Sequence, residues 1–328
     1  MRSIPFYPLL VLILVGVGAY AGCDPKSTSQ FAELLQDAGP VSHPTIAANA
    51  ASIPQRTTST VLLGSFNMER LGPSKLSDPW VMEKFAAIIS RFDVIALQEI
   101  TSKDQRTLPI LVDLVNSQGL QYSYTISPRI GREGNSYREQ YAYVFDITRI
   151  AGGADYCYVV SDEEDILHRE PFVGRFRSLY PNQPFSFSLI NIHTDPDEVN
   201  GEIDVLATVY KNVRQFEYPE DDVILLGDLN VGPDQMEPLV AIPGIIPLIN
   251  GLPTNTRRNR TIDNILIDRT NTLEFTGRAG TIDLEEMFRV ELRDAERISD
   301  HLPVWAEFSA GERTQTATAT AAGTAPTL

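Results

Sequence analysis

Six apolar runs in the sequence each have, at one end, side chains that can bind a cation or transfer a proton. In the stretch VILLGDLN, the run Val223–Leu226 ends at Gly227 and is followed by Asp228 and Asn230. A glycine removes steric bulk at this point, and side chains two residues apart project to the same side of an extended chain. The other five clusters contain Asn67, Gln98-Glu99, His193, Asp263 and Asp300-His301.

The types of these side chains indicate hydrolysis of a phosphate ester. Carboxylates and amides without clustered thiols favour Mg²⁺, Mn²⁺ or Ca²⁺ over structural zinc. Two histidines can act as acid and base near neutral pH, and each needs a carboxylate that fixes its tautomer. A cation, a base for water and an acid for the leaving oxygen together hydrolyse a phosphodiester.

Each cluster alone also has a plain structural interpretation, as a turn amide, a helix-capping acid or a core histidine. Six clusters at the ends of six apolar runs favour one shared site, because a sheet brings its strand ends into one crevice. We therefore expect these residues to converge in space, whatever the role of any one of them.

Apolar runs and helical spacing define the scaffold that must position these residues. Three segments have helical spacing, namely Trp80–Phe92, Pro109–Gln118 and Glu202–Phe216. Helices on both faces of strand layers predict an α/β sandwich, and the polar stretch Asp155–Phe172 predicts a loop at the mouth of the site. The predicted strands are Val61–Phe66, Val94–Leu97, Tyr141–Phe145, Phe185–Ile192, Val223–Leu226, Ile262–Ile267 and Val304–Phe308.

The overall charge limits how the protein can capture a polyanion. The chain has 328 residues, is 43% hydrophobic and carries a formal net charge of −16. This charge argues against unaided electrostatic capture of nucleic acid, which relies on Lys and Arg. It does not exclude a phosphate substrate, because bound divalent cations reverse the local sign.

The two ends of the chain differ in composition from its centre. Residues 1–22 have a basic start and a short apolar core, and Ala21-Gly22 before Cys23 resembles the lipobox of bacterial lipoproteins. We expect export, with the membrane as partner through lipidated Cys23; ordinary secretion and an uncleaved anchor are the alternatives. Residues 23–57 predict a flexible spacer, residues 58–309 the folded domain, and residues 310–328 a disordered Thr/Ala-rich tail.

The ordered motifs resemble a known superfamily over nearly all of residues 61–308. The series FNMERLG, ALQEI, INIHTDP, LLGDLN, TIDNILID and SDHLPV is similar to the endonuclease/exonuclease/phosphatase superfamily. The segments GNSYREQYAYVFD, HREPFVGRF and EIDVLATVY resemble its deoxyribonuclease I-like branch. The resemblance implies a metal-dependent phosphoesterase with a four-layered α/β/β/α sandwich of two mixed β-sheets flanked by helices.

The resemblance also implies which residues bind metal and phosphate. Glu99 would be the principal metal ligand, helped by Asn67 and Asp300, for Mg²⁺ or Mn²⁺ and also for Ca²⁺. Asp228 and Asn230 would hold the scissile phosphate or a second metal and orient the attacking water.

The two histidines would each pair with a carboxylate. The resemblance implies that His193, with Glu139 as its partner, is the general acid on the leaving O3′. It implies that His301, paired with Asp263, is the general base towards water. The residues by themselves leave open which histidine is the acid and which is the base.

The expected DNA contacts differ in part from those of the resembled branch. Tyr137 and Arg169 match positions that contact the DNA backbone and minor groove, although loop packing and a surface ion pair are their alternative interpretations. Two DNA-gripping arginines are absent, since Ile100-Thr101 and Asn264 occupy those regions. The basic cluster Arg257–Arg260 either compensates by meeting phosphates or is simply solvated.

We therefore expect an endonuclease that cleaves double-stranded DNA. Its sequence preference should be low, because contacts with the DNA backbone carry little information about the bases. One alternative is a phosphoesterase of small or lipid substrates, of the sphingomyelinase or inositol-phosphatase type. A second is a binding module that has lost catalysis, although the full set of polar side chains opposes it. Nothing indicates oligomerisation, so we expect a monomer.

Overall fold

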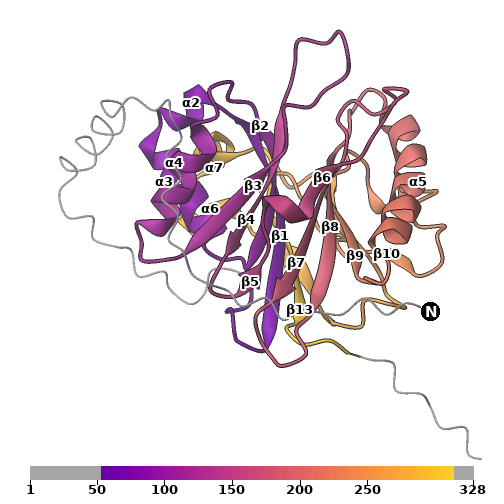
Figure 1. Cartoon of the computed structure of the whole chain (residues 1–328). Helices are drawn as coiled ribbons and strands as arrows, with labels where there is room; N and C mark the ends of the chain where they lie inside the picture. Colours follow the sequence, from indigo (N-terminus) through magenta and orange to yellow (C-terminus); the bar gives the residue numbers. More distant parts are fainter. Residues whose placement is uncertain (1–52, 314–328) are drawn as a thin grey trace, which may run out of the picture. The chain divides into compact units, whose positions relative to one another are not determined.

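Two β-sheets pack face to face with helices on their outer sides in the computed structural model, which describes residues 53–313 (Figure 1). The predicted signal segment, Cys23, most of the predicted spacer and the tail from residue 314 lie outside the described residues. Within residues 53–313, no helix has the length and apolarity needed to cross a membrane. Cys157, the one cysteine in that range, is a free thiol.

The first sheet has six strands in the order β12-β13-β1-β2-β4-β3. Strands β1 and β2 are parallel and the other neighbours antiparallel, so the sheet is mixed. In β1, Val61 and Leu63 face the second sheet and Leu62 faces the helices, as the two-residue period of a strand requires. The strands are β1 (Thr60–Leu71), β2 (Val94–Ile100), β3 (Tyr122–Ile126), β4 (Gln140–Asp146), β12 (Phe275–Thr281) and β13 (Val304–Ser309).

The second sheet has the order β10-β11-β9-β8-β7-β5, with β6 also paired to β7. Only β8 and β9 among the pairs of this sheet are parallel. Both faces of β9 are buried, which is why its sequence is a continuous apolar run rather than an alternating one. The strands are β5 (Ile150–Ala151), β6 (Cys157–Val159), β7 (Phe172–Ser178), β8 (Ser186–His193), β9 (Val223–Asp228), β10 (Ile245–Pro247) and β11 (Asp263–Asp268).

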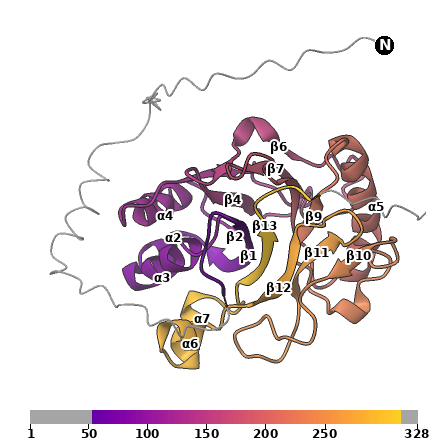
Figure 2. The same ribbon diagram turned by 90° about the horizontal axis from the view of Figure 1, so that it is seen from below.

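Helices cover the outer face of each sheet and complete four layers (Figure 2). The first sheet is covered by α2 (Pro73–Leu76), α3 (Pro79–Ile89), α4 (Thr107–Asn116), α6 (Leu284–Phe288) and α7 (Leu292–Ile298). The second is covered by α5 (Val199–Glu217), whose Ile203, Leu206 and Tyr210 are buried against the strands. Short 3₁₀ turns occur at Ala154–Tyr156 and Pro233–Gln235.

The predicted α/β/β/α sandwich and its three predicted helices are confirmed. The prediction of a continuous loop over Asp155–Phe172 is wrong at its start, because β6 pairs with β7 there. The short apolar stretch in Cys157–Val159 carried too few residues to indicate a strand. The remainder of that segment does reach the candidate site, where it contributes His168 and Arg169.

The domain extends slightly beyond the predicted limits of residues 58 and 309. Ile53 packs on the core under the first sheet, and Arg56 forms ion pairs with Asp93 and Asp146. At the other end, Ala310 is buried between the sheets and Glu312 accepts a hydrogen bond from the Ser186 amide. The polar composition of these flanks concealed the contacts that they make.

Candidate active site

The second sheet places three predicted residues side by side. Asp228 has a register partner on each side. In the parallel β8–β9 pair the partner is His193, and in the antiparallel β11–β9 pair it is Asp263. Gly227 has a φ of 146°, and a Cβ at this position would collide with the carbonyl oxygen of Ile192. The glycine therefore lets β8 and β9 approach closely where the site begins.

The first sheet contributes Asn67 from β1, Glu99 from β2 and His301 from the turn before β13. Glu99 and Asn230 both adopt positive φ, at 59° and 53°. A side chain other than glycine is rarely held in this region, at a typical cost of about 1–3 kcal/mol, and such residues cluster at functional sites. The two strained residues lie on opposite sheets and both line one cleft.

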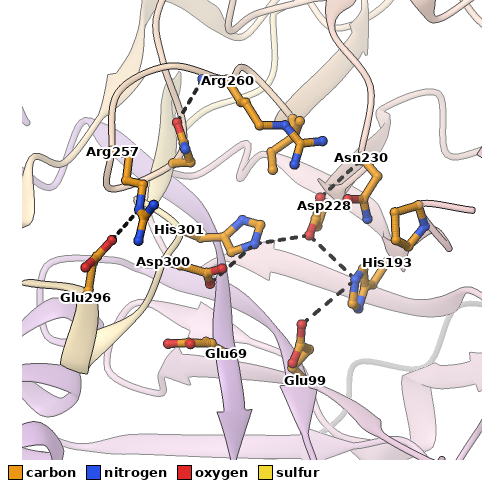
Figure 3. Close-up of a pocket in the computed structure, with 13 residues that line it drawn as sticks. Glu69, Glu99, His193, Asp228, Asn230, Arg257, Arg260, Glu296, Asp300 and His301 are labelled. Atoms are coloured by element: carbon orange, nitrogen blue, oxygen red, sulfur yellow. Dashed lines mark hydrogen bonds and ion pairs between the residues drawn. The ribbon is translucent and has the colours of Figure 1, made fainter.

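A cleft of about 530 Å³ collects these side chains (Figure 3). Its walls come from both sheets, since Glu99 belongs to β2 whereas His193 and Asp228 end β8 and β9. The residues that line it are Glu69, Glu99, His193, Pro196, Asp228, Asn230, Asn255, Arg257, Arg260, Ile262, Glu296, Asp300 and His301. The convergence expected from the sequence is thus present in the described part of the chain.

His193 is bonded to Glu139 through one ring nitrogen and faces the cleft with the other. The Nδ1 atom lies 3.0 Å from Glu139 Oε1, while Nε2 lies 3.6 Å from Asp228 Oδ2 and 4.0 Å from Glu99 Oε1. Burial lowers the pKa of His193, but the charge of Glu139 outweighs this effect and the net pKa is raised. Glu139 is fully buried, so the carboxylate is fixed as a partner of the ring.

His301 repeats this arrangement with Asp263. Its Nδ1 atom lies 3.1 and 3.0 Å from the two carboxylate oxygens of Asp263, and Nε2 lies 3.5 Å from Asp228 Oδ2. Burial lowers the pKa of His301, but the charges of Asp263 and Asp228 raise it well above its ordinary value. Ser299 fixes the backbone of His301, because the Ser299 hydroxyl accepts a hydrogen bond from the His301 amide and donates one to the Asn67 carbonyl.

Asn67 connects the carboxylates of the two sheets. Its Nδ2 donates to Glu99 Oε1 and to Asp228 Oδ2, both at 3.0 Å, and its Oδ1 accepts from the Glu69 amide. The other Glu99 oxygen accepts from the Arg70 amide at 2.9 Å. In this arrangement Asn67 positions two acids, and its role as a metal ligand stays a prediction.

The donor set of the cleft fits a hard divalent cation. Glu69, Glu99, Asp228 and Asp300 bring four carboxylates to its walls. Such oxygen ligands suit Mg²⁺, Mn²⁺ or Ca²⁺, and without a cation their charge would repel a phosphodiester. Asp228 and His301 also lie within 4.8 Å of Asp263 as possible ligands, although His301 and Asp263 already bond each other.

The predicted substrate residues Tyr137 and Arg169 line an adjoining pocket of about 310 Å³ that shares Glu99 and His193 with the cleft. Tyr137 is half-buried, and its hydroxyl donates to Glu139 Oε2 at 3.0 Å. Arg169 is buried, and its Nε donates to the His193 carbonyl at 2.8 Å. Both side chains therefore hold the first histidine pair in place, and their contact with a substrate stays a prediction.

The basic cluster of residues 257–260 divides between the cleft and the outer surface. Arg257 and Arg260 line the cleft, and Arg257 forms an ion pair with Glu296 at 2.6 Å. Arg258 points elsewhere and pairs with Asp283 and Glu285 at the start of α6. Spacing alone could not separate these arginines, because the loop has no regular period.

Several positioning residues were missed by the sequence reasoning. Glu69 lines the cleft, and its carboxylate forms an ion pair of 3.1 Å with Lys75. The Lys75 ammonium also donates hydrogen bonds to the carbonyls of Met68 and Ile298. Glu69 follows Asn67 by two residues, and this spacing was the only available signal. Lys75 acts between β1 and α7, so nothing near it in sequence indicated its role.

Ile100-Thr101 and Asn264 occupy the regions where the resembled branch has arginines. Ile100 packs in the core between β2 and the helices. Asn264 is fully buried, where its Oδ1 accepts from the Ile249 amide and its Nδ2 donates to the Ile249 carbonyl. The Ile100 and Asn264 side chains stabilise the domain, Thr101 is half-buried, and none of the three lines the cleft.

Comparisons with known proteins agree with this geometry. The model of the Endonuclease/Exonuclease/phosphatase family matches residues 64–301. Deoxyribonuclease-1-like 1 of Mus musculus is 31% identical over 257 residues, which cover 75% of this chain and 79% of that one. Deoxyribonuclease gamma of Rattus norvegicus is 30% identical over 263 residues, which cover 74% and 82%.

Solved structures support the same fold. A protein of the same family from Bacteroides thetaiotaomicron matches with a TM-score of 0.54 at 16% identity, covering 78% of this chain and 99% of that one. The human Nocturnin catalytic domain matches with a TM-score of 0.51 at 15% identity, covering 78% and 96%. At these identities the likeness concerns the fold alone.

Proposed function

The chain belongs to the endonuclease/exonuclease/phosphatase family, in its deoxyribonuclease I-like branch, and we propose that it is an exported endonuclease that hydrolyses DNA. Its relatives at 30–35% identity are named deoxyribonucleases, which supports DNA over small or lipid phosphoesters as the substrate. The proposal includes double-stranded DNA, low sequence preference and a divalent cation as cofactor.

The observation that carries this proposal is the symmetry of two histidine–carboxylate pairs about Asp228. Each histidine gives its Nδ1 to a buried carboxylate and turns its Nε2 towards the same Asp228 oxygen. Two proton-transferring atoms thus face one point from the two sheets. This is what in-line hydrolysis of a phosphodiester needs, because one proton leaves the water while another reaches the leaving oxygen.

In the proposed reaction, His301 Nε2 takes a proton from the attacking water, and Asp263 stabilises the imidazolium that results. His193 Nε2 gives its proton to the departing O3′, and Glu139 keeps the ring in the required orientation. Asp228 and Asn230 orient the water between the two rings. The reverse assignment of the two histidines is distinguishable by the leaving-group measurement described in the Discussion.

Glu99 and Asp300 are the residues proposed to hold the cation, with Asn67 aligning the Glu99 carboxylate. A bound Mg²⁺ or Mn²⁺ would neutralise the phosphate and stabilise the charge that develops on its oxygens, and Ca²⁺ is a further candidate. The all-oxygen character of the acids around the cleft supports this role.

Substrate binding is proposed to rely on the cleft arginines. Arg257 and Arg260 line the wall next to His301, and Arg260 forms no ion pair among residues 53–313. Contacts of this kind bind phosphates and carry no base code, which accounts for the proposed low sequence preference. They also offer an alternative to the arginines that are absent at Ile100-Thr101 and Asn264.

We further propose that the enzyme acts outside the cytoplasm, tethered to a membrane through lipidated Cys23. The support comes from the sequence of residues 1–23 alone. When the Cys23→Ala variant is expressed and the cells are fractionated, the exported protein should no longer be found in the membrane fraction. Retention of that variant in the membrane would point to an uncleaved anchor.

The purified full chain should nick supercoiled plasmid in Mg²⁺ and lose this activity in EDTA. A parallel panel of sphingomyelin and sugar phosphates should show no comparable turnover. Glu99→Gln serves as the matched control for contaminating nucleases, since it should remove the nicking while leaving the thermal transition in place. Turnover of the panel without nicking would replace the DNA proposal by the small-substrate alternative.

A further inference from the structure

A second group of acids lies at the ends of the strands opposite the cleft. Asp222 immediately precedes β9, whose other end carries Asp228, so about 20 Å of strand separates the two. Glu274 immediately precedes β12, and Glu312 follows β13. The chain after β13 leaves along the lower edge of the domain in Figure 1. This group therefore combines one residue of the second sheet with two that flank strands of the first.

The three carboxylates converge closely. Each offers a ligand oxygen, and these oxygens all lie within 4.8 Å of one another. Asp222 and Glu274 are each only 1% exposed, whereas Glu312 is half-buried. Carboxylates at this separation and depth repel each other strongly unless a positive charge is present.

The surroundings fix the acids without neutralising them. Glu312 Oε1 accepts from the Ser186 amide at 2.8 Å, and one Glu274 oxygen accepts from the Arg313 amide. The Thr272 hydroxyl lies close enough to Asp222 to lower its pKa, but Asp222 Oδ1 and Glu274 Oε2 are buried and have no hydrogen-bond partner of good geometry within residues 53–313. Two deeply buried acceptor atoms therefore remain unsatisfied, which is unusual for a native protein.

The local charge balance is negative throughout. Glu220 and Asp221 lie next to Asp222 and add to the negative charge. Burial and the nearby Glu274 carboxylate raise the pKa of Asp222 to about 9. The charge of Arg313 acts on Glu274, but within residues 53–313 Arg313 forms no ion pair with any of the three acids.

We propose that Asp222, Glu274 and Glu312 bind a structural Ca²⁺ that joins the two sheets at the end remote from the active site. An all-oxygen set of carboxylates suits Ca²⁺, which tolerates irregular geometry, whereas Mg²⁺ demands a near-ideal octahedron and structural zinc prefers nitrogen and sulfur. The cation would bind both unpartnered oxygens. It would also connect the start of β9 with the start of β12 and the end of β13.

The competing explanation is a proton shared between Asp222 and Glu274. Thermal unfolding separates the two, because a cation that binds only the folded chain stabilises it by an amount that grows with the logarithm of the cation concentration above Kd. The measurement uses the full chain carrying Glu99→Gln and Asp300→Asn, so that Ca²⁺ cannot act through the active-site acids. In about 1 mM Ca²⁺, the upper end of the range of Kd values of extracellular calcium modules, Tm should rise by roughly 5 °C relative to EDTA.

Adding Asp222→Asn and Glu274→Gln to that background should abolish the rise. A charge-matched pair, Asp204→Asn and Glu83→Gln, removes two exposed acids elsewhere and should preserve it. Asp222→Asn alone should eliminate calorimetric binding of one Ca²⁺, because it removes one of the three ligand carboxylates. An equal Ca²⁺ response in the Asp222→Asn chain, or no response in the parent, would overturn the proposal.

Discussion

His193 and His301 turn their Nε2 atoms towards one oxygen of Asp228, from 3.6 and 3.5 Å respectively. The first histidine ends a strand of the second sheet, and the other precedes a strand of the first. Each ring is held from behind by a carboxylate at 3.0 Å. The packing of the two sheets therefore determines the distance between the two groups that are proposed to move protons.

The roles of the two histidines can be separated with an activated leaving group. A p-nitrophenyl ester departs without protonation, so the general acid is then dispensable whereas the base is not. His193→Ala should lose about 10²–10⁴ in kcat on DNA but far less on the p-nitrophenyl ester, as measured by single-turnover rates. His301→Ala should lose a similar factor on both substrates. The opposite pattern would exchange the two roles.

The pH profile should report the charge of Asp263. A general base acts when neutral, so activity rises as pH increases through the pKa of His301. Asp263 raises this pKa, and its replacement by Asn removes a negative charge. Asp263→Asn should therefore move the rising limb of kcat/KM to lower pH while reducing the maximum. If the rising limb of the kcat/KM profile stays at the same pH in Asp263→Asn, a group other than His301 determines the pH of that limb.

The cleft arginines should control affinity and its dependence on salt. Removing Arg257 and Arg260 deletes up to two phosphate contacts, so the slope of log kcat/KM against log salt should become shallower by about 1–2. Arg258→Ala provides the control, because that side chain pairs with Asp283 and Glu285 outside the cleft. If Arg258→Ala changed the salt dependence as much as the removal of Arg257 and Arg260, overall charge alone would account for the effect.

Gly227 should be intolerant of a side chain. Gly227→Ala places a Cβ against the Ile192 carbonyl at a φ of 146°, and we expect a loss of about 2–4 kcal/mol in the free energy of unfolding. Gly201→Ala in α5 meets no neighbour within 4 Å and should be neutral or stabilising by about 0.5 kcal/mol. Urea unfolding of both variants measures the difference, and similar stabilities would contradict it.

The sequence predicted the scaffold well where a local period carries the information. Val223–Leu226 and Glu202–Phe216 were predicted as strand and helix, because burial imposes continuous or 3.6-residue patterns on them. Strands β3, β5, β6, β7, β10 and β12 were not predicted. β6 has only three residues, which lie within a polar segment. The limits of the domain were too narrow because the contacts of Ile53 and Glu312 are made with distant residues.

The composition of the site was predictable, but its internal connections were not. Polar residues at the ends of apolar runs identified both histidines and the acids Glu99, Asp228, Asp263 and Asp300, since a sheet brings its strand ends together, whereas Glu69 was missed. The hydrogen bonds of Asn67, the divergence of Arg258 from Arg257 and the inward position of Asn264 depend on side-chain orientation across the two sheets. No one-dimensional pattern records such orientation.

The central claim is that both histidines act on one phosphodiester, and cleavage of a defined DNA duplex by matched histidine variants tests it most directly. His193→Ala and His301→Ala should each slow single-turnover cleavage by about 10²–10⁴, in chains that still unfold cooperatively on heating. His168→Ala, which removes a ring that pairs with Asp195 beside the site, should stay within a few-fold of the parent. Parent-like cleavage by either of the first two variants would contradict the account.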